Sequence, residues 1–201
     1  PEIMAKRVNQ ADGVDIITTS ANNLYDGVTQ AEVEKYYNSI KDPNDPTPIS
    51  YGLNTRVTKV DGTVVEQTYC IGQLYSPAIE RIVDNLTHAA EYAENDNQRQ
   101  IITKLIEYYT TGDLRTFDEY SILWTKDTDS QVDFVNGFIE SYGDPLGMTG
   151  AWESIVNFKN LEASHRTEVL SANAQWFEDN SPVDSRFKKS EVKGVSAKVI
   201  T

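Results

Sequence analysis

Alternating apolar and polar residues predict a β hairpin near the start of the chain. Residues 54–60 and 64–71 are rich in Val, Thr and Tyr, and Asp61-Gly62 between them suits a turn with positive φ. A short run at residues 15–18 predicts one further strand.

A second β region is expected over residues 132–142, where Glu140 and Tyr142 share one parity. In an extended chain, residues of one parity project from the same face, so these two side chains should be neighbours. The turn-forming residues that follow end the strand, and residues 152–158 can return as its partner. Spacing alone leaves open the plain alternative of an exposed Glu beside a half-buried Tyr.

Apolar residues at helical spacing predict a set of amphipathic helices. Thr29 and Glu32 form a capping box, and three prolines within residues 42–48 end the helix that it opens. Further helices are expected to begin at Ser76-Pro77, at Asn95-Asp96 and at Asp113, and another to cover residues 161–177. The three helices in the middle are joined by short connections, which favours an antiparallel helical layer. The fold class is therefore α+β, helix-rich with antiparallel β hairpins.

Composition narrows the possible partners. The 201 residues carry a net charge of −13, which disfavours nucleic acid and anionic membrane surfaces. We therefore expect no nucleic-acid and no membrane partner. The single cysteine, Cys70, excludes an internal disulfide and fits a reducing compartment. Because the chain opens on Pro1 and stops within a β-prone run at Thr201, we expect an internal piece of a longer protein.

Common catalytic patterns are missing from the sequence. His88 and His165 are the only histidines, and neither sits in a zinc-ligand spacing. His88 is expected at the surface and His165 in packing contacts. No Gly-x-Ser-x-Gly elbow or phosphate-binding glycine loop occurs, and Cys70 has no basic neighbour. Trp124 ends an apolar stripe. A tryptophan at such a position more often belongs to the hydrophobic core than to a surface that binds a ligand.

A ten-residue block changes this reading. Residues 138–147, Phe-Ile-Glu-Ser-Tyr-Gly-Asp-Pro-Leu-Gly, closely resemble the Phe-Ile-Glu-Ser-Tyr-x-Asp-Pro-x-Gly block of the dipeptidyl peptidase III family of zinc metallopeptidases. The helices of residues 78–95 and 100–112, and the strand that begins Asn54-Thr55-Arg56, are also similar to that family. The likeness covers most of the chain from about residue 20 onward.

The resemblance implies a two-lobed exopeptidase that releases dipeptides from the N-terminus of oligopeptides. One lobe, with an antiparallel β core and helices, would hold the oligopeptide substrate, and a helical lobe would carry zinc. Residues 1–160 would belong to the substrate-binding lobe, and residues 161–201 would cross toward the zinc lobe and include a truncated return strand.

Site residues follow from the same resemblance. Glu140 matches the carboxylate that receives the substrate's α-ammonium, and Tyr142 matches the catalytic tyrosine. Trp124 matches an aromatic residue of the cleft, and Glu153 is expected to line the same cleft. A carboxylate at a fixed place can bind the amino end of a peptide, which sets the number of residues between that end and the bond that is cleaved. A phenol can donate a hydrogen bond to a developing oxyanion.

The family's zinc motif, His-Glu-x-x-Gly-His, does not occur in these residues. We therefore expect this piece to bind no zinc and to be inactive by itself, with zinc supplied by the rest of the parent chain. The alternatives are a non-catalytic peptide-binding or structural domain, and an unrelated helical scaffold that matches by chance. We expect a cytoplasmic location, which the cysteine content fits.

Overall fold

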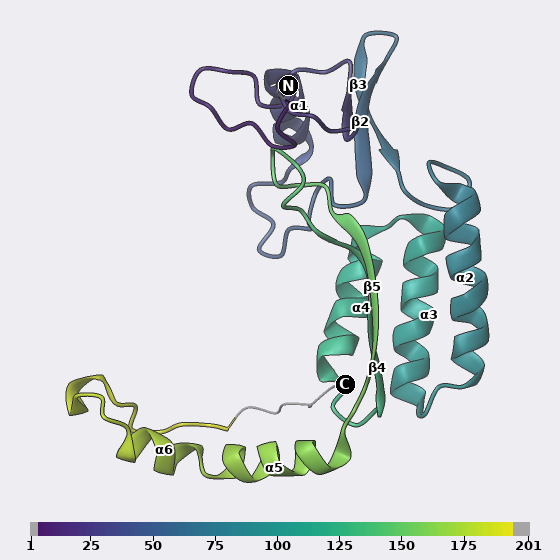
Figure 1. The fold of residues 1–201 in the computed structure, drawn as a ribbon. Helices are drawn as coiled ribbons and strands as arrows, with labels where there is room; N and C mark the ends of the chain where they lie inside the picture. Colours follow the sequence, from purple (N-terminus) through teal and green to yellow (C-terminus); the bar gives the residue numbers. More distant parts are fainter. Residues whose placement is uncertain (1–3, 195–201) are drawn as a thin grey trace. The chain divides into compact units, whose positions relative to one another are not determined.

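The computed structural model describes residues 4–194, and these adopt the expected α+β fold (Figure 1). The described elements, in chain order, are β1 Tyr25–Asp26, α1 Gln30–Ile40, β2 Thr55–Val60, β3 Thr63–Thr68, α2 Ser76–Glu91, α3 Asp96–Thr111, α4 Leu114–Lys126, β4 Val132–Glu140, β5 Ala151–Phe158, α5 Leu161–Ala172, α6 Ala174–Asn180 and a 3₁₀ turn at Ser185–Phe187. The return strand expected at the C-terminal end falls outside the described residues.

The first sheet has the order β1-β2-β3. The predicted hairpin is confirmed, because β2 and β3 pair antiparallel from Thr55 opposite Thr68 to Val60 opposite Thr63. Its turn has φ of 51° at Asp61 and 79° at Gly62, the conformation that this dipeptide favours. The edge strand β1 pairs with β2 in parallel, with Tyr25 opposite Val57.

The prediction of a strand at residues 15–18 is wrong. The segment is a turn, in which the Asp15 carboxylate accepts hydrogen bonds from the backbone N–H groups of Ile17 and Thr18 at 3.1 and 2.9 Å. Its other oxygen accepts from the N–H of Gln30 at 2.9 Å. An Asp side chain that bonds its own backbone offers the chain an alternative to a strand ladder.

Helix α1 begins with the predicted capping box, in which the Glu32 carboxylate accepts from the Thr29 N–H at 2.9 Å. Val33 and Tyr37 face inward and pack with Val57 of β2 in a core cluster that also contains Ile17 and Val28. The hydrophobic stripe of the helix therefore binds it to the first sheet.

Helices α2, α3 and α4 form the expected layer (Figure 1). The Asn95 side chain caps α3 by accepting from the Gln98 N–H, and Gly112 ends it with φ of 75°. The rings of Tyr108 on α3 and Phe117 on α4 lie 4.7 Å apart, so an aromatic contact joins these two helices.

The chain divides into two compact units, one of residues 1–125 and 136–154 and one of residues 126–135 and 155–201. Strands β4 and β5 pair in a two-stranded sheet, and each contributes residues to both units. The assignment of residues 1–160 and 161–201 to two lobes of an enzyme stays a prediction.

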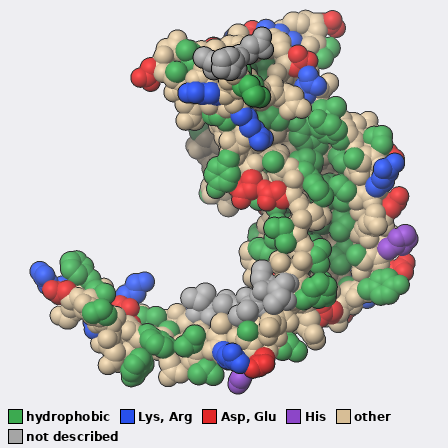
Figure 2. Space-filling model, viewed as in Figure 1, with side chains coloured by type: hydrophobic (Ala, Val, Ile, Leu, Met, Phe, Trp, Pro, Cys, Tyr) green, Lys and Arg blue, Asp and Glu red, His purple; other side chains and the backbone are tan. Residues whose placement is uncertain are grey.

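In the second unit, the helix expected over residues 161–177 is interrupted at Asn173, which ends α5 and begins α6. Figure 2 shows hydrophobic side chains along the surface of these two helices. Val169 and Leu170 on α5 and Trp176 on α6 are all exposed. No helix among the described residues is long and apolar enough to cross a membrane.

Candidate functional site

Strand β4 brings one carboxylate to the surface at its last residue. Phe138 is buried, and its ring packs 5.0 Å from that of Tyr69 and 6.4 Å from that of Tyr109. Glu140, two residues later, is exposed. Its carboxylate makes no hydrogen bond or ion pair with another described residue, so its oxygens are open to a ligand.

Tyr142 lies in a turn rather than in the strand, which corrects the expectation that it neighbours Glu140 on one strand face. The turn is closed by a hydrogen bond of 3.0 Å from the Asp144 N–H to the Ser141 carbonyl. The Gly-Asp-Pro sequence favours this turn over a continued ladder. The Tyr142 side chain is 86% exposed, and its hydroxyl has no hydrogen-bond partner among residues 4–194.

Asp144 is the buried centre of the loop that follows β4. It is only 3% exposed, and the Tyr25 hydroxyl donates to both of its carboxylate oxygens at 2.8 Å. The backbone N–H groups of Leu146, Met148 and Thr149 also donate to it, at 2.9, 2.9 and 2.7 Å. Burial, together with the neighbouring Asp144 carboxylate, raises the pKa of Tyr25, which keeps the phenol a donor.

Close contacts with the backbone hold the end of this loop, at residues 149–150, in place. The Gly150 N–H donates to the Leu53 carbonyl at 2.7 Å, and the Thr149 hydroxyl donates to the Thr55 carbonyl at 3.2 Å. A Cβ atom on Gly150 would lie 2.7 Å from the carbonyl carbon of Phe138. The loop therefore needs glycine at this position to lie against β4.

A second hydrogen-bonded group attaches β4 and β5 to α3. The Trp152 indole N–H donates to the Tyr109 hydroxyl at 2.8 Å, and that hydroxyl donates to Asn136 Oδ1 at 2.5 Å. The Asn136 amide donates in turn to the Ser154 hydroxyl at 3.0 Å. Because Tyr109 is fully buried, this link fixes the strands against the helical layer.

The other expected site residues lie on neighbouring elements of the same unit. Trp124 is half-buried in the last turn of α4, and Glu153 is half-buried on β5, the strand that pairs with β4. Their grouping with Glu140 and Tyr142 around one substrate stays a prediction.

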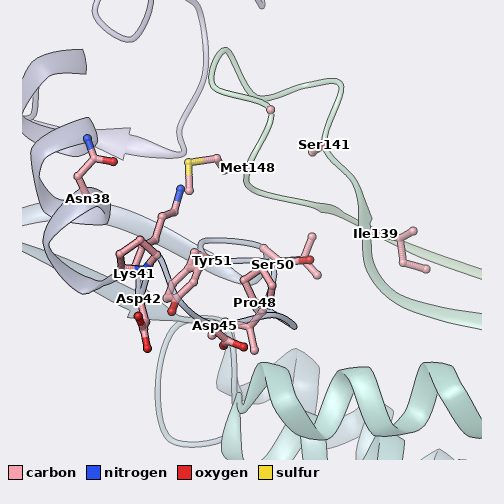
Figure 3. Close-up of a pocket in the computed structure, with 14 residues that line it drawn as sticks. Asn38, Lys41, Asp42, Asp45, Pro48, Ser50, Tyr51, Ile139, Ser141 and Met148 are labelled. Carbon is pink, nitrogen blue, oxygen red and sulfur yellow. The ribbon is translucent and has the colours of Figure 1, made fainter.

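An open pocket of about 840 Å³ lies beside the block, and the sequence did not reveal it (Figure 3). It is bounded by the end of α1, by the proline-containing loop after it, and by Ile139, Ser141 and Met148. The Lys41 ammonium lies 5.8 Å from the ring centroid of Tyr37 and 5.9 Å from that of Tyr51. In the sequence, the three prolines of this loop indicate only where a helix ends.

The described residues do not suit a catalytic metal. No group of three or more His, Cys, Asp or Glu side chains among residues 4–194 is arranged to hold an ion. His88 is exposed, as expected. His165 is exposed as well, which corrects the expectation of packing contacts, and its Nδ1 lies 3.3 Å from the Glu168 carboxylate. Burial raises the pKa of the Cys70 thiol, which disfavours the thiolate that binds metals.

Comparison with known proteins identifies a family that covers most of the chain. Residues 47–195 match the model of peptidase family M49. The chain is 36% identical over 113 residues to dipeptidyl peptidase 3 of Dictyostelium discoideum, and 33% identical over 117 residues to dipeptidyl peptidase 3 of Homo sapiens. These alignments cover 56% and 58% of the chain but 16% of each relative, so the chain spans about a sixth of their length.

A solved structure supports the fold. The structure of DPP III from Caldithrix abyssi superposes with a TM-score of 0.66 at 20% sequence identity. The superposition covers 92% of this chain and 35% of that one.

Proposed function

The chain belongs to peptidase family M49, and from this premise we propose that it forms the substrate-binding part of an enzyme that releases dipeptides from the N-terminus of oligopeptides. M49 is a family of metallopeptidases, and the relatives matched here are named dipeptidyl peptidase 3. The observation that carries the proposal is an exposed Glu140 carboxylate without a protein partner among the described residues, at the end of a strand in which Gly137 and Phe138 are buried.

Glu140 is assigned to the free α-ammonium of the substrate. A charge-assisted hydrogen bond to a carboxylate at a fixed place sets the distance between the amino end of the peptide and the bond that is cleaved. An enzyme with such an anchor removes a constant number of residues. Because Glu140 has no partner to displace among residues 4–194, binding the ammonium breaks no described ion pair.

Tyr142 is assigned to the carbonyl oxygen of the scissile peptide bond. Its phenol can donate a hydrogen bond that strengthens as negative charge develops on that oxygen. The peptide would lie extended along the strand, so that backbone hydrogen bonds hold it and varied side chains are accepted. Trp124 and Glu153 would line the same cleft.

Zinc is the metal that the proposal assigns to the complete enzyme, where it would supply the nucleophile and polarise the carbonyl. The described residues do not fit a zinc site, so no zinc ligand is assigned to them. The role of this chain is to bind and orient the peptide and to donate one hydrogen bond.

The test compares this chain with the complete gene product that contains it. Zinc content, dipeptide release and binding of a free-amine oligopeptide are measured on both. We expect the complete protein to contain zinc and to release dipeptides, while the chain alone binds the peptide weakly and cleaves nothing. A complete protein that binds the peptide without zinc or cleavage would support the non-catalytic alternative instead.

A further inference from the structure

The Tyr142 side chain needs a fixed orientation if its phenol is to act as a hydrogen-bond donor. A phenol that is 86% exposed and has no hydrogen-bond partner among residues 4–194 is not held by contacts of its own side chain. A hydrogen-bond donor accelerates a reaction only when it is already placed where charge develops. The backbone of the turn must therefore hold Tyr142 in place.

We propose that Asp144 and Tyr25 are a positioning pair that fixes the turn of Tyr142 to the first sheet. The inference rests on the proposed function, in which the Tyr142 phenol donates to the scissile carbonyl. Neither member of the pair touches substrate in this assignment. Both act through the backbone of residues 141–144.

Asp144 both closes the turn of Tyr142 and anchors it to the first sheet. The Asp144 N–H closes the turn on the Ser141 carbonyl, so the carboxylate that anchors the loop belongs to the residue that also closes the turn. Tyr25 lies on β1, which pairs with β2, and its hydroxyl reaches both carboxylate oxygens at 2.8 Å. A strand far away in sequence thus fixes the residue two positions after Tyr142.

The same carboxylate holds the segment of the loop that leads back to β5. Asp144 also accepts the N–H groups of Met148 and Thr149, and the Thr149 hydroxyl donates to the Thr55 carbonyl in β2. The turn and the return segment therefore share one buried acceptor. A buried carboxylate with every donor satisfied specifies one loop conformation, because each alternative leaves polar groups unpaired.

Two substitutions weaken this anchor to different degrees. Asp144→Asn keeps the shape but replaces one accepting oxygen by an NH₂ group, so at least one backbone N–H faces a donor. Tyr25→Phe removes the phenol donor and leaves the three backbone donors in place.

The experiment is a double-mutant cycle in the complete gene product. We expect Asp144→Asn to lower kcat by about 10-fold to 100-fold with KM little changed, as a small misplacement of a catalytic group does. In the Tyr142→Phe background the same substitution should have little further effect, because the group that it positions is gone. Tyr25→Phe should show the same pattern with a loss of about 3-fold to 10-fold.

Asp15→Asn is the matched control. Its carboxylate also accepts three backbone N–H groups, from Ile17, Thr18 and Gln30, but it organises a different loop. We expect it to lower the melting temperature as Asp144→Asn does while leaving kcat unchanged. A merely structural role of Asp144 would make the two variants alike in both measurements.

The outcomes separate the two proposals. If Asp144→Asn lowers kcat by the same factor with and without Tyr142→Phe, the positioning role is wrong although Tyr142 remains the donor. If Tyr142→Phe alone leaves kcat unchanged, the proposed function of Tyr142 fails, and the positioning role fails with it. Should Asp144→Asn not fold, the cycle with Tyr25→Phe decides, and an additive effect there overturns the inference.

Discussion

Glu140 and Tyr142 are exposed side chains between two buried ones. Phe138 and Asp144 flank them in the sequence and are 7% and 3% exposed. Exposure leaves the carboxylate and the phenol open to a ligand, while the buried neighbours restrict the backbone that carries them. The two candidates therefore combine access with a defined position.

Replacement of Tyr142 tests its role as hydrogen-bond donor. In the complete gene product, Tyr142→Phe should lower kcat by about 10²-fold to 10³-fold, as the loss of one oxyanion donor does. Peptide affinity should change little, because the hydrogen bond is strongest in the transition state. Steady-state kinetics with one oligopeptide substrate provide the measurement. An unchanged kcat would refute the assignment.

Replacement of Glu140 tests its role as amine anchor. Glu140→Gln should weaken the binding of free-amine peptides, because these peptides carry the ammonium that Glu140 binds. The binding of N-acetylated peptides, which lack this ammonium, should change little. Calorimetry with matched pairs of peptides measures both. Glu91→Gln, another exposed carboxylate of the same unit, is the control and should affect neither. Equal loss for both kinds of peptide would count against the assignment.

Gly150 tests the close contact between loop and strand. Gly150→Ala should lower the free energy of unfolding by about 1–3 kcal/mol, the usual cost of overpacking, because its Cβ would meet the backbone of Phe138 and Ile139. Gly143→Ala, whose Cβ would lie nearest to the movable end of the Arg7 side chain, should cost less. Denaturant unfolding gives both values. An equal loss of unfolding free energy in both variants would mean that the loop backbone moves to accommodate a side chain at residue 150.

At the scale of elements, local chemistry decided where most helices begin. The capping box of α1, the Asn95 cap of α3 and the Asp61-Gly62 turn all form as predicted. Local signals were less reliable inside elements. Asn173 divides the helix expected over residues 161–177, where it follows α5 and precedes α6. Its amide donates to the Val169 carbonyl, a bond that competes with helix continuation.

The start of α1 has a defined acid dependence. The hydrogen bond from Lys59, together with that from the Thr29 backbone, lowers the pKa of Glu32 to about 2 from its ordinary 4.5. A carboxyl group with a lowered pKa contributes stability above pH 4.5 that is lost as pH falls toward 2. The difference in unfolding free energy between the wild type and Glu32→Gln should therefore shrink over this range. A constant difference would show that the charge of Glu32 is not involved.

At the scale of the whole molecule, tyrosines are unusually prominent in the interior. Tyr37, Tyr69, Tyr108 and Tyr109 are buried, and burial raises the pKa of each. For Tyr69 the pKa rises to about 12 from 10.0. A buried phenol must stay neutral, because a phenolate in the core would lose its hydration.

This composition predicts alkaline unfolding. A group whose pKa is raised by folding contributes stability that is complete below its unfolded pKa of 10.0 and is lost as pH rises toward 12. The chain should therefore lose unfolding free energy steeply above about pH 10, together with a rise in tyrosinate absorbance. Tyr69→Phe should make this loss smaller. An unfolding free energy that stays constant from pH 10 to pH 12 would contradict the prediction.

The sequence by itself determined the α+β class, the helix starts, the hairpin turn and the family, since each of these depends on residues that are close together in the chain. The block of residues 138–147 was recognisable for the same reason. Tertiary structure alone decided that Tyr142 leaves the strand, that Asp144 bonds Tyr25 across the first unit, and that a pocket forms beside Ser141. These features depend on contacts between segments far apart in sequence, whose pairing no local pattern records.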